Sequence, residues 1–141
     1  MRIRRIDVFE KWYELNTPFM MSGGKVATNQ DSTIVRVETD RGLVGWGEQC
    51  AFSPNYLVGH GAGAGGAMTL LGPALLGCDP RQINLVYQRM DSALMGHAYA
   101  KSALDIACWD LLGQATELRI CDLLGGAYQE EFPLYSGCRC M

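Results

Sequence analysis

The chain has 141 residues, of which 48% are apolar and 19% are charged, and its formal net charge is −3. This length favours one domain, and this composition is typical of a globular protein rather than a disordered one. The charge provides no basic patch for nucleic acid, and no run is long and apolar enough to cross a membrane. Because Asp7, Glu10 and Lys11 interrupt any signal-peptide pattern, we expect a cytoplasmic protein.

The first third of the chain predicts three strands. Residues 2–15 are rich in β-forming residues, and residues 32–39 alternate between two faces. Residues 43–50 return as a strand after the turn Asp40-Arg41-Gly42. We therefore expect an antiparallel meander. Its third strand holds two glycines that predict the close approach of another backbone, Gly45 and Gly47.

Two long loops are expected over residues 16–30 and 51–66. The first carries an apolar tip, Phe19-Met20-Met21, and an exposed apolar tip indicates a surface that meets a ligand or another domain. The second is rich in glycine, but the spacing matches neither a P-loop nor a dinucleotide fingerprint. We therefore exclude nucleotide binding.

Three helices are expected next. The first begins at about residue 62 and ends at Gly77, and the second is predicted to be capped by Asp79, with Pro80 at its first position. Its apolar residues recur every three or four positions, and Gly96 is expected to close it. The clearest signal is the continuous apolar face of the third helix, over residues 100–112.

The third helix and the residues that follow it complete the predicted fold. Cys108 is expected in the core, whereas Lys101 is expected in solvent, weakly paired with Asp105. Asp122 to Gly126 predict a short turn, and residues 131–136 predict a lone last strand. Strands followed by helices indicate an α+β fold, here a three-stranded antiparallel meander followed by a three-helix bundle.

The six cysteines leave a redox or metal-binding reading open. Without a signal peptide, reduced thiols are favoured over disulfides. Zinc needs about four ligands, and only His60 and His97 could supply imidazole. The cysteines and histidines are therefore not expected to form a metal site.

Several motifs resemble the mandelate racemase/muconate lactonizing enzyme family of the enolase superfamily. They are Ala100 to Ala107, Trp109 to Gln114 and Leu123 to Gly126, together with the hairpin segments 31–35 and 42–48. The resemblance covers essentially the whole chain and implies an enolase-like amino-terminal capping domain over residues 1–126. Residues 127–141 would then be a linker and the first strand of a truncated (β/α)8 barrel.

Within this family the chain most resembles the hydroxyproline-betaine epimerases and cis-3-hydroxyproline dehydratases. Met21-Ser22-x-Gly24, Glu48-x-Cys50 and Gly96-His97-x-Tyr99-Ala100-Lys101 carry this resemblance. It implies a Mg-dependent enzyme that abstracts a proton α to a carboxylate of an amino-acid or hydroxyproline-type substrate. In the family the base and metal ligands sit on barrel strands, which are absent here, so the resemblance implies no catalytic residue and no metal ligand in this chain. The missing barrel would be its partner, and this chain would be inactive alone.

The resemblance implies that this chain forms the lid over the substrate. Two cap loops, at roughly residues 17–25 and 51–60, would close over the barrel mouth and exclude water. The candidate substrate-binding residues are Phe19, Met20, Met21, Ser22, Lys25 and Tyr56. Tyr56 could offer its ring to a cationic nitrogen, and packing beneath its own loop is the alternative.

Functions without a barrel are also open. The chain could be a non-catalytic interaction module that associates with itself through an exposed helix face or through the strand edge at Phe132, Leu134 and Tyr135. We accordingly expect a homo-oligomer, with no nucleic-acid or membrane partner.

Overall fold

A computed structural model, in which residues 1–52 and 56–134 are described, has the expected α+β fold. A three-stranded antiparallel sheet in the order β1-β2-β3 comes first, and helices follow it. The strands are β1 (Ile3–Met20), β2 (Val26–Thr39) and β3 (Val44–Ala51), and the helices are α1 (Gly61–Leu75), α2 (Ile83–Ala93), α3 (Ala98–Thr116) and the four-residue α4 (Ile120–Leu123). In the described ranges, no helix has the length and hydropathy needed to span a membrane.

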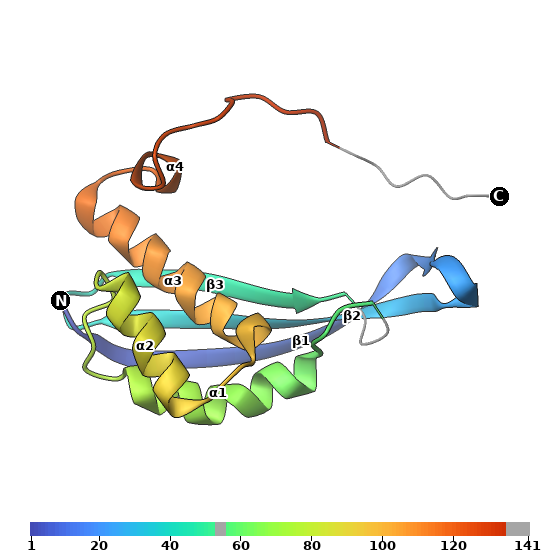
Figure 1. The fold of residues 1–141 in the computed structure, drawn as a ribbon, viewed down its shortest axis with the longest axis horizontal. Coiled ribbons are helices and arrows are strands. Elements are labelled where there is room, and N and C mark those ends of the chain that lie inside the picture. Colours follow the sequence, from blue (N-terminus) through green and yellow to red (C-terminus); the bar gives the residue numbers. More distant parts are fainter. Residues whose placement is uncertain (53–55, 135–141) are drawn as a thin grey trace.

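The hairpin of β1 and β2 is longer than the sequence predicts. The expected loop over residues 16–30 is wrong, because β1 runs on to Met20 and β2 already starts at Val26. The two strands are joined by a short turn that contains η1 (Ser22–Gly24). Pro18, which lacks a backbone N–H, falls in a stretch of irregular register, and pairing resumes at Phe19 beyond it. The end of the hairpin therefore projects beyond the helices (Figure 1).

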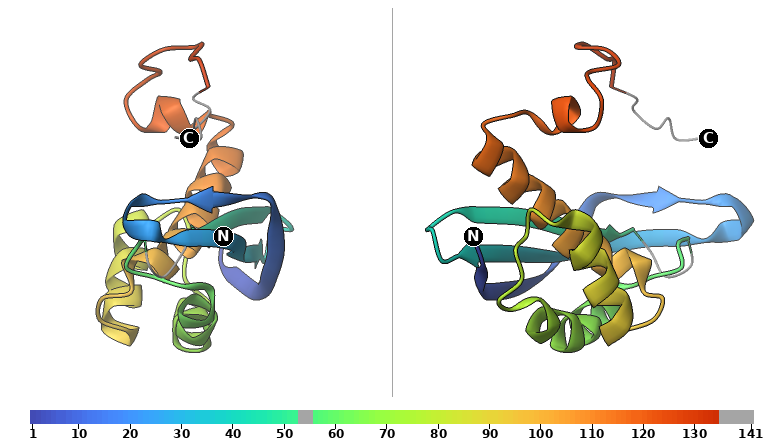
Figure 2. Two further views of the ribbon diagram at one scale, coloured as in Figure 1. Left: turned by 90° about the vertical axis from the view of Figure 1, so that its right-hand side faces the viewer. Right: turned by 60° about the vertical axis from the view of Figure 1, so that its left-hand side comes forward.

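The core lies between one face of the sheet and the helices. Val35 and Val37 of β2 have no exposed surface, and neither have the helix residues that pack in the same cluster, among them Leu71, Leu104 and Leu111. Cys108 is buried in this cluster, as its place on the apolar helix face predicts. In all three views α1 lies on one side of the sheet, and α4 with the carboxy-terminal segment lies on the other (Figures 1 and 2).

The two glycines of β3 lie under α3, as expected. A Cβ atom at Gly47 would collide with the carbonyl oxygen of Ala103, and one at Gly45 would lie 2.6 Å from Cγ of Leu111. This contact holds α3 against an edge strand, and side chains of α3 also bind the backbone of that strand. Asp110 accepts a hydrogen bond from the backbone N–H of Trp46 at 2.9 Å, and the side-chain amide of Gln114 donates to Val44 O at 2.8 Å.

The start of α2 differs from the prediction. The helix begins at Ile83 rather than at Pro80, and Asp79 does not cap it. The carboxylate of Asp79 instead accepts from the backbone N–H of Arg81 at 3.1 Å and pairs with the guanidinium of Arg81 at 2.7 Å. This hydrogen bond and ion pair lower the pKa of Asp79 to about 2. A local turn closed by the side chain of Asp79 therefore forms where the sequence predicts the first turn of the helix.

The prediction that Lys101 lies in solvent is wrong. Lys101 is buried in α3 with 3% of its surface exposed, and its Nζ lies 2.5 Å from a carboxylate oxygen of Asp91 in α2. The expected pairing with Asp105 is not formed. A position in an amphipathic pattern gives the helix face, but it does not reveal that a second helix covers that face.

The carboxy-terminal segment also differs from its prediction. Residues 131–134 are not a strand, and the remaining part of the expected strand, Tyr135 and Ser136, lies outside the described residues. The turn expected over residues 122–126 is present: α4 ends at Leu123, and Gly125 and Gly126 adopt φ values of 108° and 106°. The division at residue 126 into a capping domain and a linker stays a prediction.

Candidate functional site

A cavity of about 370 Å³ lies at the projecting end of the β1–β2 hairpin. Its walls come from two segments far apart in the sequence, the hairpin end and the segment that follows β3. The lining residues are Phe19, Met21, Ser22, Lys25 and Tyr56. The structure thus brings together five of the six residues that the sequence analysis proposed for substrate binding.

Met20 is the one candidate that does not line this cavity. It lies opposite Val26 in the ladder and is 54% exposed. Because side chains alternate along a strand, Met20 points to the opposite side from Phe19 and Met21. The sequence predicts a loop at this tip, and in a loop this alternation would be lost.

An aromatic cluster joins the two walls. The ring of Phe19 meets the ring of Phe52 edge to face with centroids 5.0 Å apart, and Phe52 meets Tyr56 in the same manner at 5.9 Å. Sequence reasoning missed Phe52, although an aromatic residue directly after the third strand was a usable signal. Tyr56 is 63% exposed.

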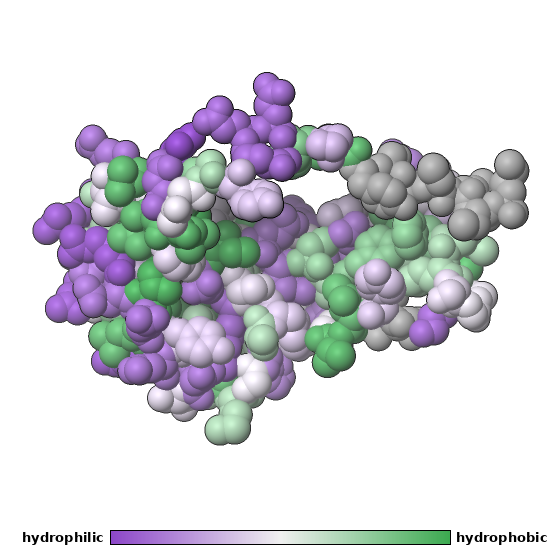
Figure 3. Space-filling model, turned by 45° about the horizontal axis from the view of Figure 1, so that its top comes forward, coloured by the Kyte–Doolittle hydropathy of each residue, from purple (hydrophilic) through white to green (hydrophobic). Residues whose placement is uncertain are grey.

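The surface of this region suits binding more than proton transfer. In the space-filling view, apolar side chains gather over the hairpin end (Figure 3). Ser22 adds a hydroxyl and Lys25 adds a positive charge, and the described residues that line the cavity include no carboxylate or imidazole. The cavity can hold and shield a small ligand with an anionic group and an apolar part.

The open face of the sheet carries a tyrosine whose pKa is shifted. The hydroxyl of Tyr13 lies 4.0 Å from the sulfur of Cys50, on the face that the helices leave free. Burial first, and then the hydrogen bond with Cys50, raise the pKa of Tyr13. A phenol with a raised pKa stays neutral at physiological pH and can serve there only as a hydrogen-bonding group.

The thiols and carboxylates of the described residues do not gather into a metal site. Across residues 1–52 and 56–134, no three His, Cys, Asp or Glu residues are placed to hold a metal ion. Four cysteines of the described ranges are free, and burial raises the pKa of Cys108 to about 12, which suppresses its reactivity. Cys138 and Cys140 lie outside the described residues.

This sheet, its helical layer and the cavity at the hairpin end define a capping domain of the enolase type. The family of mandelate racemase / muconate lactonizing enzyme amino-terminal domains matches residues 3–125, and the chain belongs to it. A cis-3-hydroxy-L-proline dehydratase from Roseibium aggregatum is 43% identical over 136 residues, which are 96% of this chain and 37% of the relative.

Two solved structures show the same fold. One is a mandelate racemase/muconate lactonizing enzyme from Roseovarius nubinhibens ISM complexed with magnesium, with 42% identity and a TM-score of 0.91 over 96% of this chain and 37% of that one. The other is a dipeptide epimerase from Enterococcus faecalis V583 complexed with Mg and the dipeptide L-Leu-L-Tyr, with 35% identity and a TM-score of 0.82 over 89% and 35%. The chain spans little more than a third of these relatives.

Proposed function

We propose that this chain is the substrate-capping domain of a Mg-dependent enolase-superfamily enzyme that abstracts a proton α to a carboxylate. The observation that carries the proposal is the single cavity shared by the hairpin end and the segment after β3. In the racemases and dehydratases of this family, segments at these positions would close over the substrate. The similarity to a cis-3-hydroxy-L-proline dehydratase supports an amino-acid or hydroxyproline-type acid as the substrate.

In this function the chain binds and shields the substrate and leaves the bond-breaking chemistry to a barrel. Its described residues offer no group that fits magnesium, so we assign the metal to that barrel, where it would stabilise the enediolate when bound. Lys25 would attract a carboxylate, and the aromatic cluster of Phe19, Phe52 and Tyr56 would exclude water from it. Without a barrel, no turnover is expected.

Tyr56 provides the test of this proposal. In an enzyme that joins this chain to its barrel, Tyr56→Ala should raise KM for a quaternary-amine acid about tenfold, because a desolvated cation–π contact contributes roughly 1–2 kcal/mol. The KM for a neutral acid of the same size should change much less. Steady-state kinetics with both substrates measures the difference.

The matched control is Tyr56→Phe, which keeps the aromatic face and removes only the hydroxyl. It should leave KM for the quaternary amine close to that of the parent enzyme. Equal changes for the two substrates in Tyr56→Ala would refute the role of the ring. A normal KM for both substrates would refute the placement of this cavity over the active site.

A second candidate function, a self-associating module, is favoured by the apolar surface of the carboxy-terminal segment. Tyr128 is fully exposed and Leu134 is 89% exposed, while Phe132 and Leu124 are 68% and 66% exposed. Exposed apolar surface of this kind favours association. We expect the purified chain to sediment as an oligomer whose mass rises with concentration, and Phe132→Ser with Leu134→Ser to reduce that mass. A monomer over the whole concentration range would contradict this function.

A further inference from the structure

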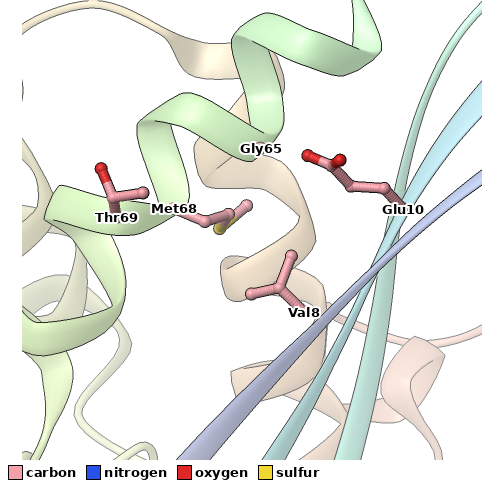
Figure 4. A pocket seen from close by; sticks show the side chains of 5 residues that line it. All are labelled: Val8, Glu10, Gly65, Met68 and Thr69. Atoms are coloured by element: carbon pink, nitrogen blue, oxygen red, sulfur yellow. The ribbon is translucent and has the colours of Figure 1, made fainter.

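A groove runs between the edge strand β1 and helix α1, separate from the cavity at the hairpin end. It consists of two cavities of about 380 Å³ and 230 Å³, and Glu10 lines both. In the larger one Val8 and Met68 form apolar walls, and the carboxylate of Glu10 points toward α1 at Gly65 (Figure 4). A Cβ atom at Gly65 would collide with this carboxylate, so glycine keeps the space for it.

The smaller cavity is built on two cross-strand pairs below the first turn of α1. Glu10 lies opposite Thr33, and Trp12 lies opposite Asp31. Since alternate residues share a face, these four side chains all point to the helix side of the sheet. The carboxylates of Glu10 and Asp31 belong to diagonal neighbours, whose backbone positions are roughly 7–8 Å apart.

Two neighbours with the opposite orientation also border the cavity. Lys11 and Ser32 form the intervening pair, and Ser32 donates a hydrogen bond to Glu48 on the open face of the sheet. By the same alternation the ammonium group of Lys11 is directed away from the helix side. The side chains that point to the helix side therefore carry a net negative charge.

The groove contains a buried hydroxyl, that of Thr33, whose hydrogen-bonding capacity is not used. The side chain of Thr33 is 1% exposed, and its hydroxyl oxygen has no hydrogen-bond partner. Among the ion pairs of the described residues, none involves Glu10 or Asp31. The side-chain oxygen of Gln49, which lies opposite Thr33 in β3, is likewise buried without a hydrogen-bond partner. A buried hydroxyl is nearly always hydrogen-bonded in folded proteins, so the isolation of Thr33 beside two carboxylates that form no ion pair points to a missing hydrogen-bond partner.

We propose that this groove binds the primary ammonium group of a small amine. Such a group has three N–H donors, and Glu10, Asp31 and Thr33 provide three acceptors. Trp12, which is 59% exposed, can cover the charge, and Val8 with Met68 can contact the carbon chain. Calcium suits the site less, because it takes six to eight oxygen ligands and an apolar wall offers none.

Isothermal titration of the 141-residue chain with n-butylammonium chloride tests this site. The amine should bind saturably, and n-butanol, which has the same chain without the charge, should not. Glu10→Gln and Asp31→Asn should each weaken binding about tenfold, because a charge-assisted hydrogen bond is lost. Glu130→Gln, an exposed carboxylate remote from the groove, should leave the affinity unchanged.

Two further variants separate binding from folding. Thr33→Val removes the unpartnered hydroxyl at constant shape, so it should weaken binding roughly threefold without lowering the melting temperature. Gly65→Ala improves helix propensity and displaces the carboxylate of Glu10, so it should weaken binding in a chain that folds normally.

Three results would overturn the proposal. These are equal binding of n-butanol and n-butylammonium, unchanged affinity in Glu10→Gln and Asp31→Asn, and dissociation of an oligomer by the amine in a sedimentation run. The last would show that the groove receives a lysine side chain of a second copy rather than a free amine.

Discussion

Replacing Gly47 with alanine is expected to lower the melting temperature of the chain by roughly 6–12 °C. The new Cβ would collide with the carbonyl oxygen of Ala103 and lie 2.9 Å from the backbone nitrogen of Ala107. These are backbone atoms of α3, so no rotamer change can relieve the contact, and the helix must move off the sheet. Such overpacking costs about 3 kcal/mol, a large part of the stability of a domain.

The matched control is Gly66→Ala in α1, where a Cβ would meet no atom within 4 Å. Alanine is favoured over glycine inside a helix by about 1 kcal/mol, so this variant should melt a few degrees higher than the parent chain. Thermal unfolding followed by circular dichroism compares the two. A Gly47→Ala chain that melts within about 1 °C of the parent would show that α3 does not rest on β3 as described.

The sheet and α3 could be predicted because their signals are local. Thr33, Val35 and Val37 recur at every second position of their strand, and the apolar face of α3 is continuous over three turns, so each pattern indicates the element and its buried side. The length of the hairpin could not be read in this way. Phe19 pairs with Ala27 only because the partner strand is present. Pro18, directly before Phe19, is a residue type that usually marks the end of a strand.

The candidate site was predictable for a different reason. The family resemblance indicated which segments would meet, and the structure places Phe19 and Tyr56 in one cavity. The resemblance gives no side-chain orientation, so it does not distinguish Met20, which lies outside the cavity, from Phe52, which contacts two of the lining aromatic rings. The groove at Glu10 and Thr33 had no sequence signal at all, because its acceptors come together only when β1, β2 and α1 pack.

Asp91→Ala is expected to destabilise the chain by about 2 kcal/mol. It leaves the ammonium of Lys101, which is 3% exposed, without its carboxylate partner in α2. Removing one partner of a buried pair can cost 3–5 kcal/mol, and because the side chain of Asp91 is 50% exposed, solvent access lowers that penalty. Urea unfolding gives the free energies of the parent chain and the variant.

Lys101→Met tests the same pair from the other side. Methionine fills a volume similar to that of the lysine stem and leaves Asp91 able to turn into solvent, so this variant should stay within about 1 kcal/mol of the parent chain. In that background Asp91→Ala should cost almost nothing, which gives a coupling energy of about 2 kcal/mol in the double-mutant cycle. Additive effects would mean that Lys101 is held by packing alone, and that the contact with Asp91 does not join α2 to α3.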